Sequence, residues 1–516
     1  MGKERDLAKP VINNVEDVLD SLGGFGRFQF MILVLVLFLE IPIAFVVFVP
    51  VFIGAAPSEW LCDTRVISRF EACSCNGTLS ALDPDMSVVS EWNLVCEASW
   101  VADTVVSFQM AGMVVGNLFV TQLADWYGRR YCFLGITIEV ILGSVLTALA
   151  PNPYVYAIAR FMCGAGFCGF LSISAIYAME FLTPQYRVLA SVGPFGEGIM
   201  LLGLVAYLIR PWRSLVWVTI LPFFAIAAIF PFIPESPRWL LRNQRIEECS
   251  KSLNYIARVN GKEPIDVVTL KHLAQKESST TNQAEDGQVK RTSYIEFFKD
   301  PELRKTALIL QGIWFSWGVV YFGLSYNIKN MAGSPYLNIM YMGLADALGY
   351  PSAVLLNKFV GRRQALVSFM TLAAIFLVSI AILQLTADLS GKEYVVAILC
   401  LIGKFGTAGA RTSARTLTGE SFPTSVRTMG LGIAGVTGSI GAAVSPQLAY
   451  IGTNYPSVPF FVFALISVLG SVVSFLLKET SGEPMREETG TVKETPEEMG
   501  RKVSISTIIS ANEFRR

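Results

Sequence analysis

The sequence predicts an all-α membrane protein in which twelve transmembrane helices form two six-helix bundles. The first observation is composition: of 516 residues, 53% are hydrophobic and 16% are charged, and the mean hydropathy is +0.50. A soluble domain carries about 25% charged residues. The deficit of charge extends along the whole chain, so a single membrane anchor does not explain it. The other two observations are a series of long apolar runs and an internal repeat.

Apolar runs recur along the chain, and each is long enough to cross the roughly 30 Å hydrocarbon core of a bilayer. We predict spans at about 29–51, 101–122, 131–150, 154–177, 189–209, 214–233, 305–325, 336–356, 364–386, 393–416, 429–449 and 457–477. The weakest are 336–356 and 393–416, because both contain charged residues. A soluble protein with buried helices explains one such run but not the whole series. The polar first 27 residues and the long run from Phe28 do not fit a cleavable signal peptide.

Basic residues gather in alternate loops between the predicted spans, as the positive-inside rule requires of cytoplasmic loops. They are Arg129 and Arg130, Arg187, Arg238, Arg242 and Arg245, Arg362 and Arg363, and Arg427. This alternation places both termini in the cytoplasm. Arg210 and Arg213 fall on the opposite side and count against this topology.

The loop 54–99 is then extracellular, and its residues fit an oxidising space. It contains four cysteines, Cys62, Cys73, Cys75 and Cys96, which indicate disulfides whose pairing the sequence leaves open. It also contains a glycosylation sequon, Asn76-Gly77-Thr78. Both features agree with the topology from the charges.

Residues 234–303 form the longest polar stretch within the chain and separate two predicted bundles, 28–233 and 304–478. The halves share a pattern. Gly128-Arg129-Arg130 recurs as Gly361-Arg362-Arg363, and Glu180 with Arg187 recurs as Glu420 with Arg427, seven residues apart both times. The predicted cytoplasmic tails are 1–27 and 479–516, and 276–292 has the composition of a disordered segment. Internal repeats are typical of secondary transporters, which work by alternating access.

The repeated Gly-Arg-Arg turns suggest how the halves interact. Gly128 allows a tight cytoplasmic turn between the second and third spans. We expect Asp125, at the helix end, to pair with a basic residue of the other bundle or with a helix N-terminus. Such a pair would latch the halves on the cytoplasmic side, with Arg129, Arg130 and the equivalent residues of the repeat. The alternative is a plain turn whose charges only set the topology.

Other functional classes find no support in the sequence. There is one histidine, and no cluster of histidine and cysteine has the spacing of a metal site. No phosphate-binding loop and no nucleophile paired with a base are present, so neither an enzyme nor an ATP-driven pump is predicted. No cofactor is expected, and the net charge of zero implies no nucleic-acid partner.

Several stretches resemble motifs of a transporter family. The turn DWYGRR (125–130) resembles the loop 2–3 signature of the major facilitator superfamily, and PESPRWLL (234–241) resembles sugar porters and the organic cation/anion/carnitine transporters. The stretches NVEDVL (14–19), GRFQ (26–29), EWNLVC (91–96) and IARVNGK (256–262) point to the latter family. The resemblance covers roughly residues 10–480. It implies the major facilitator fold and a polyspecific plasma-membrane carrier of small organic ions. The loop 54–99 departs from the family, because it is shorter and has four cysteines where six are typical.

Ionisable residues inside spans are functional hypotheses, since each costs roughly 2.5–3.5 kcal/mol to insert. The candidates are Glu40, Glu139, Glu197, Asp346, Lys404, Arg411 and Arg415. The last three share one face of a helix. By resemblance, Asp346 falls where cation and carnitine carriers have a glutamate, and Lys404 matches the family's Gly-Lys-Phe. Ser439 stands where cation carriers have an aspartate and anion or carnitine carriers an arginine.

These charges predict a site for both ends of a zwitterion. Asp346 would hold an ammonium group, while Lys404 and Arg411 would hold a carboxylate. The alternative is that Asp346 forms an internal salt bridge with Lys404 or Arg411 and binds nothing. Glu40 is a candidate for a second cation contact or a protonation site.

Aromatic residues of the seventh span add a further expectation. Trp314, Trp317 and Tyr321 follow each other at three- and four-residue steps and therefore share a helix face. Aromatic faces attract quaternary ammonium groups. They serve equally well for packing between helices, and the sequence does not separate the two roles.

The sequence therefore predicts a plasma-membrane transporter of small organic cations or zwitterions, carnitine-like, that works by alternating access. A coupled proton or sodium ion, or the membrane potential, would supply energy. The competing hypotheses are an organic-anion carrier of the same fold, a sugar porter, and a non-transporting membrane receptor or accessory protein.

Overall fold

The computed structural model describes residues 14–69, 71–183, 185–186, 193–275, 301–331, 333–386, 393–422 and 427–480. Long helices dominate it. Those of the first half are α2 (Arg27–Phe38), α3 (Glu40–Phe48), α4 (Pro50–Ile53), α6 (Val101–Tyr127), α7 (Arg129–Ala148), α8 (Pro153–Phe181), α9 (Phe195–Leu208) and α10 (Trp212–Ile229). Those of the second half are α15 (Pro301–Tyr326), α16 (Pro335–Val360), α17 (Arg362–Thr386), α18 (Glu393–Ser421), α19 (Arg427–Asn454) and α20 (Ser457–Ser474).

Most of the predicted spans correspond to helices that are long enough to cross a membrane. In the described part of the chain, 11 helices are long and apolar enough to cross a bilayer, with α2, α3 and α4 counted as one helix from Arg27 to Ile53. The two weakest predictions are confirmed, since α16 and α18 are both among them. The fifth predicted span corresponds to α9, which has 14 residues and a length of about 21 Å at 1.5 Å per residue.

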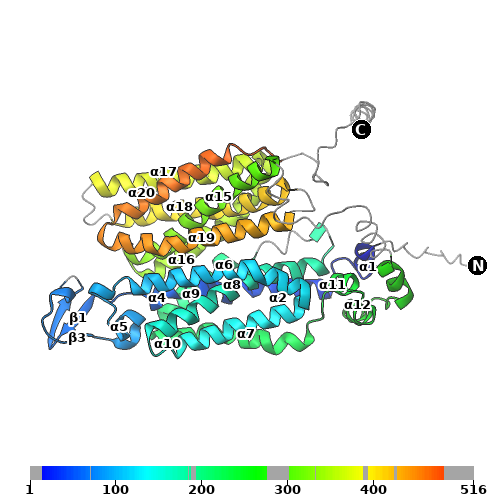
Figure 1. Ribbon diagram of the computed structural model, residues 1–516, viewed down its shortest axis with the longest axis horizontal. Coiled ribbons are helices and arrows are strands. Elements are labelled where there is room, and N and C mark those ends of the chain that lie inside the picture. The colour runs from blue at the N-terminus through cyan, green and yellow to red at the C-terminus, as the bar shows by residue number, and fades with distance from the viewer. Residues whose placement is uncertain are drawn as a thin grey trace, which may run out of the picture.

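The helices form two bundles that lie side by side (Figure 1). In the first half, α8 packs on α6 and α7, and α9 packs on α3; in the second, α15 packs on α19, and α17 packs on α18 and α20. The bundles meet where α6 contacts α19 and where α9 contacts α16. At the second contact, Gly196 and Gly343 let the backbones touch, because a Cβ on Gly343 would lie 2.6 Å from the carbonyl oxygen of Gly196.

One end of the molecule carries a small domain, residues 54–100, which we call the disulfide domain (Figure 1, at the left). Three short antiparallel strands pair in the order β2-β1-β3, with bounds Arg65–Ser68, Glu59–Cys62 and Leu79–Ala81. Short helices follow: η1 (Ala72–Ser74), η2 (Pro84–Met86), α5 (Val88–Glu91) and η3 (Cys96–Ala98). The four cysteines form two disulfides, Cys62–Cys75 and Cys73–Cys96. The adjoining end of the bundles is called the disulfide end below.

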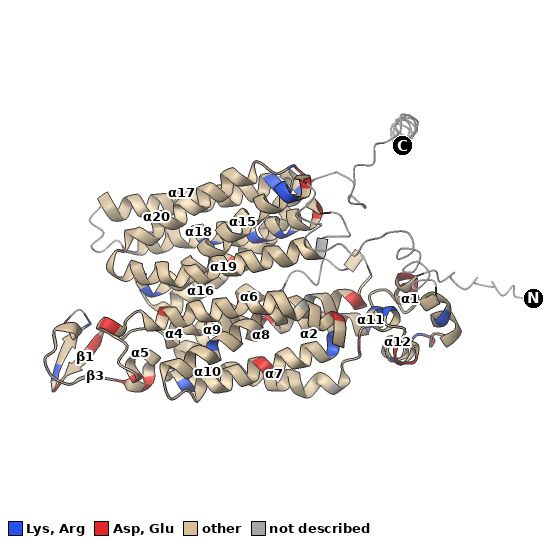
Figure 2. Cartoon of the chain, viewed as in Figure 1, with Lys and Arg blue, Asp and Glu red and all other residues tan. Residues whose placement is uncertain are grey.

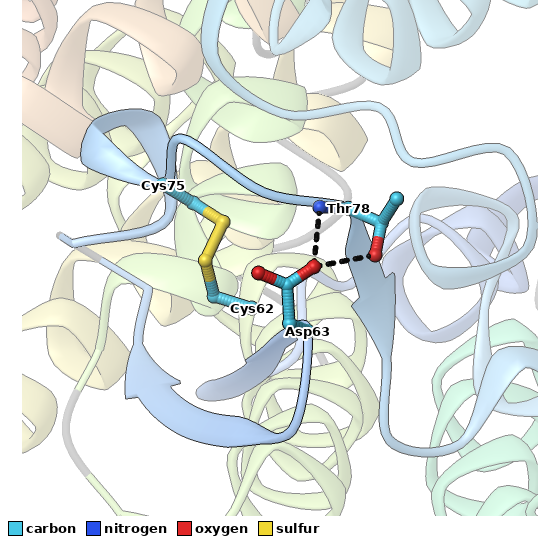
Figure 3. Close-up of a disulfide and its surroundings, with 4 residues drawn as sticks. All are labelled: Cys62, Asp63, Cys75 and Thr78. Atoms are coloured by element: carbon cyan, nitrogen blue, oxygen red, sulfur yellow. Dashed lines mark hydrogen bonds between the residues drawn. A yellow bond between two sulfur atoms is a disulfide. The ribbon is translucent and has the colours of Figure 1, made fainter.

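Asp63 organises the turn next to the Cys62–Cys75 disulfide (Figure 3). Its Oδ1 accepts hydrogen bonds from the backbone N–H and the hydroxyl of Thr78, both at 2.9 Å. The backbone hydrogen bond first, and then the hydroxyl, lower the pKa of this exposed carboxyl below its ordinary 3.8. A lowered folded pKa means that the stabilisation is present above pH 3.8 and is lost as the pH falls through the folded value.

We therefore expect the Thr78 amide to be protected from hydrogen exchange at neutral pH and to lose that protection in acid. The measurement is hydrogen–deuterium exchange of the peptide around Thr78, in the full-length protein, across pH 2 to 6. Asp63→Asn should exchange fast throughout and serves as the reference for intrinsic pH effects. Equal profiles for the two proteins would contradict the assignment.

The opposite end carries α1 (Val15–Ser21), α11 (Pro237–Arg242) and α12 (Ile246–Asn260), and we call it the α12 end (Figure 1). Asn14 begins α1 with a capping box, accepting from the N–H of Asp17 at 2.8 Å and donating its own N–H to the Asp17 carboxylate. Asn260, at the end of α12, accepts from the N–H of Phe28 at 2.9 Å. Two of the motifs that carry the family resemblance thus anchor the polar helices to the first span.

Candidate functional site

The deepest charged groups of the second bundle form a buried ion pair. The Nζ atom of Lys404, on α18, lies 3.6 Å from Oδ2 of Asp346, on α16, and neither side chain has any solvent exposure. The same oxygen accepts a hydrogen bond from the Tyr321 hydroxyl at 2.6 Å, whereas Oδ1 has no hydrogen-bond partner within the described part of the chain. Lys404 also donates to the hydroxyl of Ser325 at 2.7 Å and lies 3.1 Å from the centre of the Tyr321 ring. The internal salt bridge that the sequence left open is therefore present in this conformation.

A polar chain connects this pair to Arg411, about two helical turns further along the same face of α18. The hydroxyls of Tyr321 and Tyr350 lie 3.3 Å apart, and Arg411 donates to the Tyr350 hydroxyl at 3.3 Å. The Arg411 guanidinium also lies 5.7 Å from the Trp317 ring centre and 5.9 Å from that of Phe195. Arg411 is partly exposed, in contrast to the buried pair. Arg411 is therefore the solvent-accessible cation that lies nearest to the buried pair.

An acid of the first bundle lies close to the arginines of the second, and a further acid lies near it. The Glu40 carboxylate, on α3, is close enough to feel the charges of Arg411, Arg415 and Glu197. Glu197 and Arg415 are exposed and Glu40 is partly exposed. A Cβ on Gly193, just before α9, would overlap the Glu40 carboxylate, so glycine leaves room for the acid there. Four accessible charges, two of each sign, thus come from opposite bundles.

The aromatic residues predicted to share a helix face do so along α15. The Trp314 and Trp317 rings lie 5.5 Å apart, and those of Trp317 and Tyr321 lie 5.0 Å apart. Their polar edges bond to α18: the Trp314 indole N–H donates to the Thr418 hydroxyl at 3.0 Å and that of Trp317 to the carbonyl of Thr407 at 3.1 Å. All three are buried. Trp317 is the member of this face against which the Arg411 guanidinium packs.

The Gly-Arg-Arg turns lie at the α12 end and have the same structure in both halves. Gly128 and Gly361 have φ angles of 97° and 94°, which favour glycine. After each turn, a carboxylate accepts from the first two backbone N–H groups of the next helix: Glu235 for α7 and Glu479 for α17. This arrangement satisfies helix donors and complements the helix dipole. Burial raises the pKa of Glu235, although the three backbone N–H groups that it accepts from oppose this.

Figure 2 shows acidic and basic residues gathered at this end of both bundles. Among the described residues, the ion pairs of each turn join residues of the same bundle, so these pairs do not form the expected latch. Arg129 pairs with Asp125 at 2.8 Å and with Glu180 at 3.0 Å, and Arg362 pairs with Glu420 at 3.1 Å. The first pair spans the turn, from the last turn of α6 to the first residue of α7, so Asp125 is paired locally. Helix N-termini, the other predicted partner of Asp125, are taken by the glutamates described above. Arg187 and the side chain of Arg427 lie outside the described residues.

Contacts between the bundles instead lie at the disulfide end and at mid-depth. Lys329, in η6 (Asn327–Asn330), donates to both carboxylate oxygens of Asp103 on α6, at 2.7 and 2.6 Å. Tyr326 donates to the carbonyl of Val47 at 2.9 Å. The deepest such bond joins Asn117 to Ser439, at 3.0 Å, so Ser439 connects the two halves in this structure. The hydrogen bonds and the ion pair named here all lie at this depth or nearer the disulfide end, and they hold that end closed.

Two arginines that sequence reasoning missed or misjudged have clear structural roles. Arg160 on α8 is 1% exposed, and it donates to Gln109 Oε1 at 3.0 and 2.6 Å and to the carbonyl of Val46. In the sequence, Arg160 could have been recognised only as a charged residue within a long apolar run. Arg213, which counted against the topology, is neutralised by Glu91 of the disulfide domain at 2.5 Å. Because this pairing neutralises its charge, Arg213 is only weak evidence against the predicted topology.

The comparisons with known proteins agree with this fold. The Sugar (and other) transporter family model matches residues 93–489. An inward-open structure of the xylose transporter XylE from E. coli aligns with a TM-score of 0.63 at 16% identity, covering 89% of this chain and 98% of that one. These matches define the class: a transporter with the major facilitator fold.

Two curated relatives define the family more closely. Organic cation transporter 1 of Caenorhabditis elegans is 30% identical over 404 residues, 77% of this chain and 68% of the relative. Solute carrier family 22 member 15-like of Xenopus laevis is 30% identical over 481 residues, 92% of this chain and 95% of the relative. The chain belongs to the organic cation/anion/carnitine transporter family of the major facilitator superfamily. It is thus a multi-pass membrane transporter, and its relatives are transporters rather than enzymes.

Proposed function

We propose that the protein carries small organic zwitterions, of the size and charge of carnitine, and simple organic cations more weakly. The observation that carries this proposal is that the accessible acid Glu40, with Glu197 near it, lies close to two accessible arginines of the other bundle, Arg411 and Arg415. The acids attract the ammonium end, and the Arg411 guanidinium attracts the carboxylate through parallel hydrogen bonds. We assign the ammonium to Glu40 rather than to Asp346, because Asp346 is fully buried against Lys404.

Binding of a zwitterion would itself drive the transport cycle. The acids belong to the first bundle and the arginines to the second, so a bound zwitterion bridges the bundles. It would draw their α12 ends together and close that side, whereas the contacts at the disulfide end must then open. A substrate contributes to this change only by interacting more favourably with the closed state. A zwitterion carries no net charge, so an inward gradient or a coupled proton or sodium ion would supply the energy.

Carriage of organic anions is the alternative within the same family. Three cations of α18, Lys404, Arg411 and Arg415, outnumber the acid Asp346. Counting the acids of the first bundle removes this excess, because Glu40 is close to the arginines and Glu197 is close to Glu40. Balanced charge favours a zwitterion over a dianion.

The proposal is tested by uptake into oocytes of carnitine, a quaternary ammonium cation and a dicarboxylate. We expect carnitine to enter fastest. Arg411→Gln should reduce carnitine uptake about tenfold or more, because a charge-assisted hydrogen bond contributes about 1.5–3 kcal/mol, and should spare the cation. Glu40→Gln should reduce uptake of both. Preferred uptake of the dicarboxylate would establish the anion carrier, and absence of any uptake by protein at the cell surface would favour a non-transporting receptor.

We also propose that the protein lies in the plasma membrane with the disulfide domain outside and both termini in the cytoplasm. The two disulfides and the exposed side chain of Asn76 support this orientation. Asn76→Gln should abolish an electrophoretic shift that glycosidase removes from the wild-type protein. Thr78→Ser keeps the sequon and should retain the shift. An unglycosylated wild-type protein whose disulfide domain resists surface labelling would contradict the orientation.

A further inference from the structure

A cavity of about 360 Å³ lies beneath the disulfide domain, separate from the candidate site. We call it the domain cavity. Its walls come from three parts of the molecule: Glu59 and Asp83 of the disulfide domain, Phe52 of the first bundle, and Pro335 and Tyr336 of the second. Its volume falls within the range of small-molecule sites, about 300–1,000 Å³.

The polar groups of the domain cavity favour a cation. Glu59, at the start of β1, and Asp83, just before η2, are exposed carboxylates, and neither has an ion pair or side-chain hydrogen bond among the described residues. Arg210, on the opposite wall, already lies 5.8 Å from the ring centre of Tyr207. Two carboxylates therefore face one guanidinium, which leaves the lining with an excess of negative charge.

Three other polar side chains of the cavity already have partners. The hydroxyls of Ser87 and Ser90 bond to each other at 3.0 Å, and the Trp212 indole N–H donates to Glu91 at 2.8 Å. A ligand such as a sugar, which needs several hydrogen bonds, would find few there. The domain cavity therefore suits a ligand with one positive group and an apolar body.

The apolar wall offers a place for that body. The Phe52 and Tyr336 rings, from different bundles, stack with centres 5.3 Å apart and planes at 10°. Met86 and the exposed Leu82 extend this surface toward the acids. Aromatic faces attract quaternary ammonium groups, so the ring pair and the carboxylates select the same kind of ligand.

We propose that the domain cavity is a second binding site, for an aromatic or alkyl ammonium ion. Its occupant touches both bundles at the disulfide end, and would therefore stabilise the conformation closed at that end. The consequence for transport rests on the proposed function, since it assumes the alternating cycle, but binding itself does not. A compound at this site would inhibit the carrier without occupying the site between Glu40 and Arg411.

The test is equilibrium binding of radiolabelled phenyltrimethylammonium to the full-length protein in lipid nanodiscs. We expect a component whose affinity falls about tenfold in Glu59→Gln/Asp83→Asn, as loss of two exposed charge partners predicts. Asp85→Asn/Glu97→Gln is the matched control, because these acids lie in the same domain but do not line the cavity. The control should bind like wild type, and Glu40→Gln should retain the component.

Two outcomes would overturn the proposal: unchanged binding in Glu59→Gln/Asp83→Asn, or an equal loss in the control. Tyr336→Ala provides an independent check, because it removes the aromatic wall without changing charge, and it should weaken the same component. If carnitine is not transported but this component persists, the proposed function fails while the second site stands.

Discussion

Replacement of Asp346 by asparagine is expected to abolish carnitine uptake and to reduce the amount of folded protein. The substitution leaves the Lys404 ammonium fully buried without its counter-ion. Removal of one partner from a buried ion pair costs about 3–5 kcal/mol, a large part of a typical folding free energy of about 5–15 kcal/mol. The measurements are carnitine uptake per molecule at the cell surface and the thermal unfolding of purified protein.

A second substitution separates a structural role of this pair from contact with substrate. The methionine side chain is similar in length to that of lysine and has no charge. The double variant Asp346→Asn/Lys404→Met therefore contains no uncompensated charge at this position. We expect the double variant to regain stability and uptake, because buried ion pairs are often replaced by apolar groups at little cost. Lys404→Met alone should be as damaging as Asp346→Asn. A stable double variant without uptake would show that the pair contacts the substrate, as the sequence hypothesis held.

Much of the fold follows from the sequence because a bilayer imposes strong constraints. Each crossing needs an uninterrupted apolar helix, which is a local property. The charges in α16 and α18 made those spans the weakest predictions, yet Asp346 and Lys404 are tolerated because they neutralise each other. The start of the short helix α9 was harder to predict. The predicted span 189–209 begins several residues before Phe195, where the described helix begins.

The candidate site was only partly predictable, because pairing between helices is not a local property. The sequence identified Asp346, Lys404, Arg411 and Glu40 as charges in the membrane. It left open whether Asp346 pairs with Lys404, pairs with Arg411 or holds a substrate, and only the packed helices show the buried pair with Lys404. Glu479 illustrates the same limit: it lies 117 residues from Arg362, and only the packed bundle shows that it accepts from that backbone N–H.

The direction of closure could not be predicted from the sequence either. A pair across the bundles was expected at the cytoplasmic turns, where charges are dense and repeated. Those turns satisfy their charges locally through pairs such as Arg129–Asp125. The described ion pair that crosses the interface, Asp103–Lys329, comes from two residues that no repeat or motif marked.

Weakening that pair is expected to open the disulfide end. The Lys329 ammonium contacts both oxygens of Asp103, and the two side chains are only 24% and 13% exposed. A hydrogen bond to a charged group contributes about 1.5–3 kcal/mol, so Lys329→Gln should raise the population of the open state about ten- to hundredfold. Transport should slow, because the carrier would close less readily at this end.

Opening can be measured by labelling a cysteine placed at the interface. Val47 is fully buried and its carbonyl accepts from Tyr326 of the other bundle, so Val47→Cys should react with an impermeant maleimide only when the disulfide end opens. The unpaired native cysteines of the described chain are buried and give little background. Labelling should be faster in Lys329→Gln and in Asp103→Asn than in the Val47→Cys parent.

A double-mutant cycle decides whether the ion pair causes the effect. If the two residues act through each other, Asp103→Asn/Lys329→Gln should label no faster than either single variant. Charge reversal, Asp103→Lys/Lys329→Asp, should restore slow labelling, because the attraction between the bundles is restored. Fully additive effects, or no rescue by reversal in a protein that reaches the surface, would mean that packing rather than this pair holds the end closed. The Asn117–Ser439 bond and the α9–α16 contact would then carry the closure.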